Sequence, residues 1–168
     1  MMGKRLIFLC GASGVGKTTL CRELLKRTPG SAYVDSDPLR LMNPFVLSDE
    51  TAPAIQKNLS CVLLNYLQCP AVDTLIFSYG FHGRRREIFA GVMEDIAGQS
   101  FRFYPFLLTC GEEENVRRMR LDGRDEERIE RALKVSRAAY EGVPYPKIDV
   151  TNLSVQEAAA LILERCGL

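Results

Sequence analysis

The chain has no excess of charge of one sign and no long apolar run. It carries 22 Lys and Arg against 21 Asp and Glu, for a formal net charge of +1, and this balance argues against a protein that binds nucleic acid through a strongly basic surface. No segment is apolar over the roughly 20 residues that a membrane-spanning helix needs. The apolar run Leu6–Cys10, behind the basic N-terminus, is too short for a signal peptide. We therefore expect a cytoplasmic protein with no membrane partner, and we do not expect nucleic acid as a partner.

Residues that bind zinc are also scarce. The chain has one histidine and six cysteines without a C-x-x-C pair, a pattern that argues against a zinc site. Most of the cysteines lie in apolar runs and are expected to be buried thiols in a reducing compartment. The histidine, His82, is expected to make a polar contact in a loop rather than to act in catalysis. No repeat, low-complexity tract or linker interrupts the sequence, which predicts one domain over residues 1–168.

The most informative motif is the glycine-rich run from Gly11 to Thr18, GASGVGKT. It follows an apolar strand and precedes a helix that begins near Lys17, so backbone N–H groups and the positive end of the helix dipole point to one place, where phosphate is the natural ligand. In such a P-loop, Lys17 reaches the β- and γ-phosphates and the Thr18 hydroxyl binds Mg²⁺. The expected nucleotide-binding residues of this loop are Gly11, Ala12, Ser13, Gly14, Val15, Gly16, Lys17, Thr18 and Thr19.

Short apolar runs alternate with longer helical patterns along the chain, which is typical of parallel βαβ units. Strands are expected at residues 5–10, 32–35, 74–78, 101–109 and 147–150. Helices are expected at residues 17–27, 51–67, 84–97, 112–121, 125–139 and 155–166. The pattern predicts the α/β class: a three-layer α/β/α P-loop NTPase fold with a five-stranded parallel sheet and a helical lid. Ligands of such sheets bind beyond the carboxyl ends of the strands, so residues that follow the strands are the site candidates.

Two carboxylates and an arginine follow the second expected strand. Asp35 and Asp37 would lie near the γ-phosphate, where a carboxylate accepts the proton of an acceptor hydroxyl or holds Mg²⁺ through water. Arg40 would bind an anionic or hydroxylated acceptor. A structural alternative for Asp37 is the N-cap of a helix that begins at Pro38, a role that is compatible with catalysis.

The third expected strand ends at Ser78, where a typical P-loop ATPase has an aspartate that supports Mg²⁺. This difference disfavours the motor-ATPase and GTPase interpretations and leaves the carboxylates after the second strand as candidate metal ligands. Arg84, Arg85 and Arg86 open the next helix, where positive charge opposes the helix dipole unless an anion binds nearby. We expect Ser78, Arg84 and Arg85 to contact the acceptor. The alternative is a solvated basic turn balanced by Glu87.

Segment 112–139 has the charge pattern of a lid. Acidic residues begin its first helix, basic residues end it, and Gly123 separates it from a second helix. A hinged helix pair of this kind closes over transferring phosphates and excludes water. Arg120 and Arg124, four residues apart, are the candidates for stabilising charge on the nucleotide's γ-phosphoryl group. Alternatives are Arg117 in that role, or an exposed helix covered with ion pairs.

Two further segments complete the expected site. Thr151 and Asn152 follow the last strand and would give polar contacts to an adenine ring, although a turn formed by Asn152 explains the pattern as well. Segment 41–66 contains no recognisable motif and is the expected acceptor-binding segment.

Together these segments resemble the small P-loop kinases of the adenylate kinase-like group, in an order similar to that of adenylylsulfate kinase and gluconate kinase. The stretch Val34–Arg40 resembles the D-x-D-x-x-R segment that binds the acceptor and carries the proposed base in adenylylsulfate kinases. Ser78 and the arginines after it resemble the Ser-plus-basic segment of both families. The resemblance implies ATP and Mg²⁺ as cofactors. The segments with which adenylylsulfate kinases hold their sulfate nucleotide are missing after Arg40, and no gluconate pocket is recognisable, so the acceptor stays open.

We therefore expect an ATP- and Mg²⁺-dependent phosphotransferase that moves the γ-phosphate to a hydroxyl of a small metabolite or nucleotide. Lys17, Asp37, Arg120 and Arg124 are the expected catalytic residues. The expected partners are ATP and a small-molecule hydroxyl acceptor, and the chain is expected to be a monomer or a homodimer. Alternatives are a polynucleotide 5′-hydroxyl kinase, which the near-neutral charge disfavours, and a non-enzymatic nucleotide switch, which lacks the N-K-x-D guanine motif.

Overall fold

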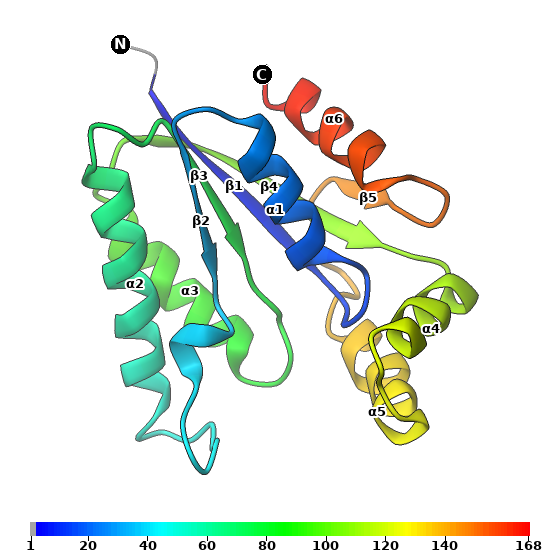
Figure 1. Cartoon of the computed structure of the whole chain (residues 1–168). Helices are drawn as coiled ribbons and strands as arrows, with labels where there is room; N and C mark the ends of the chain where they lie inside the picture. The colour runs from blue at the N-terminus through cyan, green and yellow to red at the C-terminus, as the bar shows by residue number, and fades with distance from the viewer. Residues whose placement is uncertain (1–2) are drawn as a thin grey trace.

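Five parallel strands form one sheet with the order β2-β3-β1-β4-β5. The computed structural model describes residues 3–168 (Figure 1). The strands are β1 (Lys4–Gly11), β2 (Ser31–Asp35), β3 (Thr74–Ser78), β4 (Phe101–Thr109) and β5 (Lys147–Asp149). Each lies within one residue of the predicted bounds, so the predicted parallel α/β sheet is confirmed.

Helices cover both faces of the sheet. Helix α1 (Lys17–Arg27) packs against α6 (Val155–Arg165) on one face, and α2 (Ala52–Gln68) packs against α3 (Arg85–Ile96) on the other, which makes a three-layer α/β/α sandwich. A capping box at Ser154 starts α6. No helix among residues 3–168 has the length and apolar character to cross a membrane.

The remaining helical segments stand beyond the carboxyl end of the sheet (Figure 1). They are the short 3₁₀ turn η1 (Pro38–Arg40), α4 (Glu112–Leu121), α5 (Glu126–Arg131) and the π-helical turn η2 (Ala132–Ser136).

The prediction of one regular helix over residues 125–139 is wrong, because η2 interrupts its α-helical hydrogen bonding. Asp125 starts α5 by accepting a hydrogen bond from the Arg128 backbone N–H (2.8 Å). The π turn then carries Ser136 to the P-loop, where its hydroxyl oxygen accepts a hydrogen bond from the Ser13 backbone N–H (2.8 Å). Single π turns inside helices are frequent at functional sites.

The central strand β1 carries the middle of the apolar core. Leu6–Cys10 is wholly buried, because both faces of a central parallel strand are covered by helices. Phe8 lies among aromatic rings, with centroid distances of 4.5 Å to Phe89 of α3, 5.5 Å to Phe77 of β3 and 6.1 Å to Phe103 of β4. This cluster ties α3 to the three central strands.

The register of the sheet brings three loops to one edge. Asp35 at the end of β2 lies opposite Ser78 at the end of β3, and Ser78 lies opposite Leu9 of β1. The P-loop continues directly from β1. The P-loop, the segment after Asp35 and the loop after Ser78 therefore leave the sheet side by side.

We expect Phe8→Ala to lower the free energy of unfolding by about 3–5 kcal/mol, because it removes a fully buried ring from a close-packed cluster. Urea denaturation would measure the loss. The control is Leu168→Ala at an exposed position, which should change stability by less than about 0.5 kcal/mol. A loss in Phe8→Ala no larger than in the control would contradict the importance of the cluster.

Candidate active site

The loop between β1 and α1 holds two glycines in the left-handed region of backbone conformation. Gly14 has a φ of 81° and Gly16 a φ of 98°. A Cβ at Gly14 would overlap the Met119 side chain and lie 2.8 Å from Nδ2 of Asn115. That amide also donates a hydrogen bond to the Ser13 carbonyl (3.0 Å), so α4 supports the loop from outside. Glycine at such positions permits the concave arrangement of backbone N–H groups that binds phosphate.

Lys17 lies folded beneath this loop. Its ammonium donates hydrogen bonds to the carbonyls of Gly11 (2.6 Å) and Ala12 (3.1 Å). Desolvation of the charged form lowers the pKa of Lys17 to about 8. A polyphosphate bound in the loop would place negative charge beside this ammonium and stabilise its charged form.

A cavity of about 400 Å³ opens beyond the carboxyl ends of β1, β2 and β3, and we call it the phosphate cavity. It is lined by residues of the P-loop, the η1 segment, the loop after β3 and the turn after α4. These residues are Ser13, Gly14, Gly16, Lys17, Thr18, Thr19, Asp35, Ser36, Asp37, Arg40, Ser78, Tyr79, Gly80, His82, Arg85, Asp122 and Arg124. The cavity thus brings together most of the residues that the sequence offered as catalytic, metal-binding or acceptor-binding.

Asp37 is held in the cavity by Arg40, its neighbour one helical turn later. The Asp37 carboxylate accepts a hydrogen bond from the Arg40 guanidinium (2.5 Å), and Asp35 Oδ1 accepts one from the Asp37 backbone N–H (3.1 Å). Partial burial alone would raise the pKa of Asp37, but the hydrogen bond and charge of Arg40 outweigh it and hold this pKa below its ordinary value. Asp37 does occupy the N-cap position before Pro38, as the structural alternative expected, but its side chain makes no capping hydrogen bond to η1.

Three buried side-chain atoms around the cavity find no hydrogen-bond partner within residues 3–168: Nε of Arg40, the hydroxyl of Tyr79 and Nδ1 of His82. Arg85 lies beside them, and burial together with the charge of Arg40 lowers its pKa. Burial, then the charge of Arg85, lowers the pKa of His82 to about 4, so this imidazole is neutral at physiological pH. Buried polar atoms are nearly always satisfied in proteins, so these three atoms are candidates for hydrogen bonds to a polar ligand of this cavity.

Two of the predicted catalytic and acceptor-binding residues, Arg84 and Arg120, lie outside the phosphate cavity. Arg84 is exposed and forms ion pairs with Asp49 (2.5 Å) and Glu87 (3.6 Å). Arg120 is exposed and pairs with Glu126 (2.9 Å) across the turn between α4 and α5. Arg124 does line the cavity. Of Arg120 and Arg124, only Arg124 therefore reaches the phosphate cavity.

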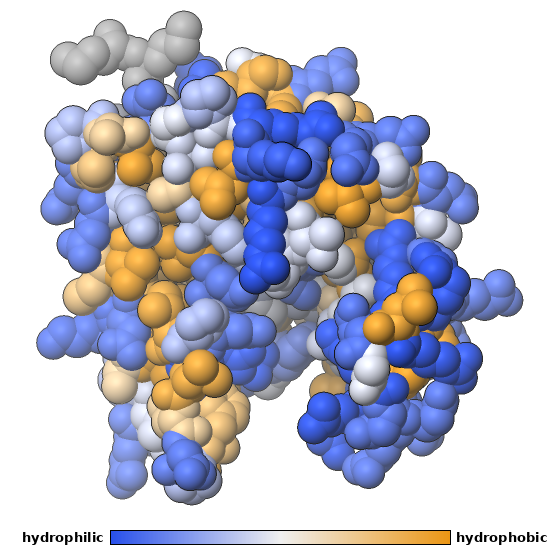
Figure 2. Space-filling view, in the orientation of Figure 1, coloured by the Kyte–Doolittle hydropathy of each residue, from blue (hydrophilic) through white to orange (hydrophobic). Residues whose placement is uncertain are grey.

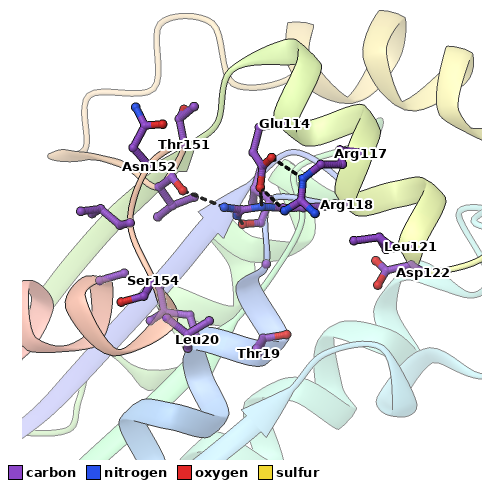
Figure 3. Close-up of a pocket in the computed structure, with 17 residues that line it drawn as sticks. Thr19, Leu20, Glu114, Arg117, Arg118, Leu121, Asp122, Thr151, Asn152 and Ser154 are labelled. Atoms are coloured by element: carbon purple, nitrogen blue, oxygen red, sulfur yellow. Dashed lines mark hydrogen bonds and ion pairs between the residues drawn. The ribbon is translucent and has the colours of Figure 1, made fainter.

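A second cavity, of about 560 Å³, lies on the other side of the P-loop between α4 and the segment after β5 (Figure 3). Thr151 and Asn152 line it, as does Arg118, which the sequence did not single out. Arg118 donates hydrogen bonds to the carbonyls of Val15 (3.2 Å) and Val150 (2.8 Å), and Glu114 accepts a third (2.8 Å). Arg118 therefore connects the P-loop, α4 and the segment after β5. The spacing of four residues between Glu114 and Arg118 was the one feature of the sequence that could have indicated this role.

The residues at the P-loop fit Mg²⁺ bound together with a nucleotide. Among residues 3–168 no group of three or more His, Cys, Asp and Glu side chains is arranged to hold a metal ion. Mg²⁺ usually keeps several waters and binds one or two carboxylates together with substrate phosphates. The Thr18 hydroxyl and the carboxylates of Asp35 and Asp37 line one cavity with the P-loop, which is such a donor set.

A family described as an AAA domain matches residues 7–139, and the chain belongs to this family. A search of curated proteins found no match.

Solved structures share the whole fold. The tunicamycin resistance protein of Deinococcus radiodurans is 23% identical, with 98% of this chain and 96% of that chain covered and a TM-score of 0.70. A gluconokinase of Sinorhizobium meliloti 1021 is 16% identical (96% and 93% covered, TM-score 0.63). Shikimate kinase of Acinetobacter baumannii, in complex with shikimate, is 21% identical (97% and 93% covered, TM-score 0.62). These likenesses confirm the P-loop NTPase-like fold, which the gluconokinase and the shikimate kinase share. The resemblance to adenylylsulfate kinase stays a prediction.

We expect Gly14→Ala to weaken ATP binding at least about tenfold while the protein stays folded, since a Cβ here both strains the backbone and displaces Met119. Calorimetric titration with an ATP analogue would measure the affinity. Gly98→Ala is the control, because its Cβ would meet open space. Equal affinity in the two variants would contradict the inferred role of Gly14.

We expect nucleotide binding near pH 9 to take up between about half and one proton, because the polyphosphate would raise the pKa of Lys17 from about 8. Calorimetry in two buffers with different ionisation enthalpies would measure this uptake. It should be small at pH 6.5, where Lys17 is already protonated, and absent at both pH values in Lys17→Met. A binding enthalpy at pH 9 that does not depend on the buffer would contradict the lowered pKa.

Proposed function

We propose that this member of the AAA domain family is an ATP- and Mg²⁺-dependent phosphotransferase that moves the γ-phosphate to a hydroxyl of a small molecule. One observation carries the proposal: the P-loop residues Lys17 and Thr18 share a cavity with an ionised carboxylate, Asp37, and with polar atoms that lack partners. A nucleotide switch needs no such second set of polar groups beside its phosphate site. A transfer enzyme does, because it must bind and orient an acceptor.

The nucleotide would occupy the two cavities that meet at the P-loop. The loop N–H groups and Lys17 would hold the β- and γ-phosphates, and Thr151 and Asn152 would contact the adenine in the 560 Å³ cavity beside Arg118. Thr18, with Asp35 or Asp37 through water, would hold Mg²⁺. When bound, this ion would neutralise charge on the β- and γ-phosphates.

Asp37 would act as the base. Its lowered pKa keeps the carboxylate ionised at neutral pH, so it would orient the acceptor hydroxyl as a hydrogen-bond acceptor and take its proton only as the new P–O bond forms. The acceptor oxygen would bond to the γ-phosphorus while the bond from that phosphorus to the β–γ bridging oxygen breaks. The acceptor's proton passes to Asp37 and ADP leaves.

The acceptor would be held by Arg40, Ser78 and Arg85, which line the cavity. The unpartnered Tyr79 hydroxyl and His82 Nδ1 would add hydrogen bonds to it. Guanidinium groups are suited to carboxylates, phosphates and vicinal hydroxyls. Arg84 is a weaker candidate, since it would first have to leave Asp49.

Segment 112–139 would act as the lid and segment 41–66 as the acceptor-binding segment. Arg124 already faces the phosphate cavity and would stabilise charge on the transferring group. Arg120 would join it only after its ion pair with Glu126 opens during lid closure.

We expect Asp37→Asn to lower kcat at least about 100-fold while the affinity for ATP changes less than about threefold, because the amide keeps the shape but cannot take the proton. Turnover would be followed by ADP release and by mass detection of the phosphorylated product. Gluconate, shikimate and pooled sugars, nucleosides and nucleotides would serve as acceptors.

Asp49→Asn is the matched control, since it removes an exposed carboxylate that pairs with Arg84 outside the cavity. Unchanged transfer in Asp37→Asn would rule out Asp37 as the base. ATP binding by the unmodified protein without product from any acceptor would instead favour the nucleotide switch.

A further inference from the structure

Exposed apolar side chains gather beside the phosphate cavity on the segment between η1 and α2. Leu41, Phe45 and Val46 are 82%, 45% and 51% exposed. Phe45 is linked to the cavity directly, because the guanidinium carbon of Arg40 lies 5.6 Å from the centre of its ring. Arg40 in turn holds Asp37. We call Leu41, Phe45 and Val46 the loop edge.

The loop edge is held in place by local contacts. Leu47 and Met42 pack against the core. The Thr51 hydroxyl donates a hydrogen bond to the Val46 carbonyl (2.6 Å) and accepts one from the Ser48 backbone N–H (2.9 Å). The apolar side chains are thus presented by a structured segment.

A second apolar surface lies at the π turn of the lid. Val135 is 57% exposed and, with Ala132, lines a third cavity of about 400 Å³. Arg128 and Arg131 line it as well, but their guanidinium groups pair with Asp125 (3.6 Å) and Glu127 (3.0 Å) of their own helix. We call Ala132 and Val135 the lid edge.

The third cavity adjoins the phosphate cavity. Ser13, His82 and Arg124 line both. Figure 2 shows hydrophobic surface at the lower left of the molecule, over the segment between η1 and α2, across a hollow from the lid helices. Apolar side chains thus lie against Arg40 of the polar phosphate cavity and in the third cavity beside it, an arrangement that suits a molecule with a polar end and an apolar body.

We propose that the acceptor is an amphipathic alcohol, whose hydroxyl-bearing polar end enters the phosphate cavity and whose apolar alkyl or aryl part lies between the loop edge and the lid edge. The inference rests on the proposed function and adds the chemical class of its substrate. A compact polar acceptor would leave both edges in water, whereas an apolar substituent would remove them from water, which favours binding in proportion to the apolar surface buried.

The first test compares acceptors in matched pairs that share a head group. The probes are methyl, phenyl and octyl glycosides of neutral and acidic sugars, and nucleosides with and without an alkyl group on the base. Product is detected by mass spectrometry with Mg-ATP. The phenyl or octyl member of at least one pair should have a kcat/KM about tenfold or more above its methyl partner, chiefly through a lower KM.

The variants Phe45→Ser and Val135→Ser test the two edges. Each should reduce this ratio of kcat/KM within the pair several-fold, because the apolar substituent loses its contact surface. Leu168→Ser, at an exposed apolar residue of the C-terminus, is the control and should leave the ratio unchanged. An equal loss of kcat/KM for both members of a pair would mean that the two edges contact each other when the lid closes, rather than the substrate. That result would overturn the inference.

A binding measurement separates this inference from catalysis. The aromatic anion 8-anilinonaphthalene-1-sulfonate should bind the unmodified protein with a rise in fluorescence, and at least about fivefold more weakly to Phe45→Ser and Val135→Ser than to Leu168→Ser. Equal binding to all of these proteins would overturn the inference.

The outcomes for the two proposals differ. Phosphorylation of compact acceptors with no gain from an apolar substituent would overturn the inference and leave the phosphotransferase proposal standing. ATP binding without any phosphorylated product would overturn both proposals.

Discussion

The parallel register of β1, β2 and β3 is the constraint on which the site depends. Asp35 lies opposite Ser78 and Ser78 opposite Leu9, so the P-loop and the loops that carry Asp37 and Arg85 start from one edge of the sheet. A slip of one strand by one residue would move its loop by roughly 3.3 Å, which is more than the positioning of reacting groups tolerates. The wholly buried residues of β1 resist such a slip because it would exchange the side chains that face the two helical layers.

The basic side chains Lys17 and Arg85 of the phosphate cavity are desolvated, whereas the arginines on the surface of α4 and α5 are exposed and paired. The lid arginines Arg120, Arg128 and Arg131 pair with carboxylates of neighbouring turns and are exposed. In the cavity, burial instead lowers the pKa of Lys17 and of Arg85. Groups that are desolvated without full compensation gain most when an anion arrives. The desolvated Lys17 and Arg85 therefore favour the polyphosphate that we propose for this cavity, for electrostatic as well as geometric reasons.

Much of the fold was predictable because its signals are local. Short apolar runs and period-3.6 patterns located the strands and most helices to within one residue. The break after Arg131 was missed because a single π turn is too short to leave a periodic signal in the sequence. The lid arginines show the limit. Arg120 and Arg124 are equivalent by spacing, but Gly123 between them has a φ of 75°, which turns the chain and sends only Arg124 into the cavity. Likewise Arg117 and Arg118 are adjacent in sequence, and a rotation of about 100° per helical residue decides which one meets Val150.

By itself the sequence determined the P-loop, the parallel α/β class and the carboxylates that follow β2, because glycine placement, strand periodicity and strand ends are properties of neighbouring residues. Only the tertiary structure decided which distant polar groups share one cavity: Tyr79 and His82 with Arg40, and Arg118 with the segment after β5. It also decided that Phe45 lies against Arg40 of the phosphate cavity while Val135, 90 positions away in the chain, lines the adjoining cavity. Desolvation and missing hydrogen-bond partners arise from contacts between segments far apart in the chain, and no local pattern encodes them.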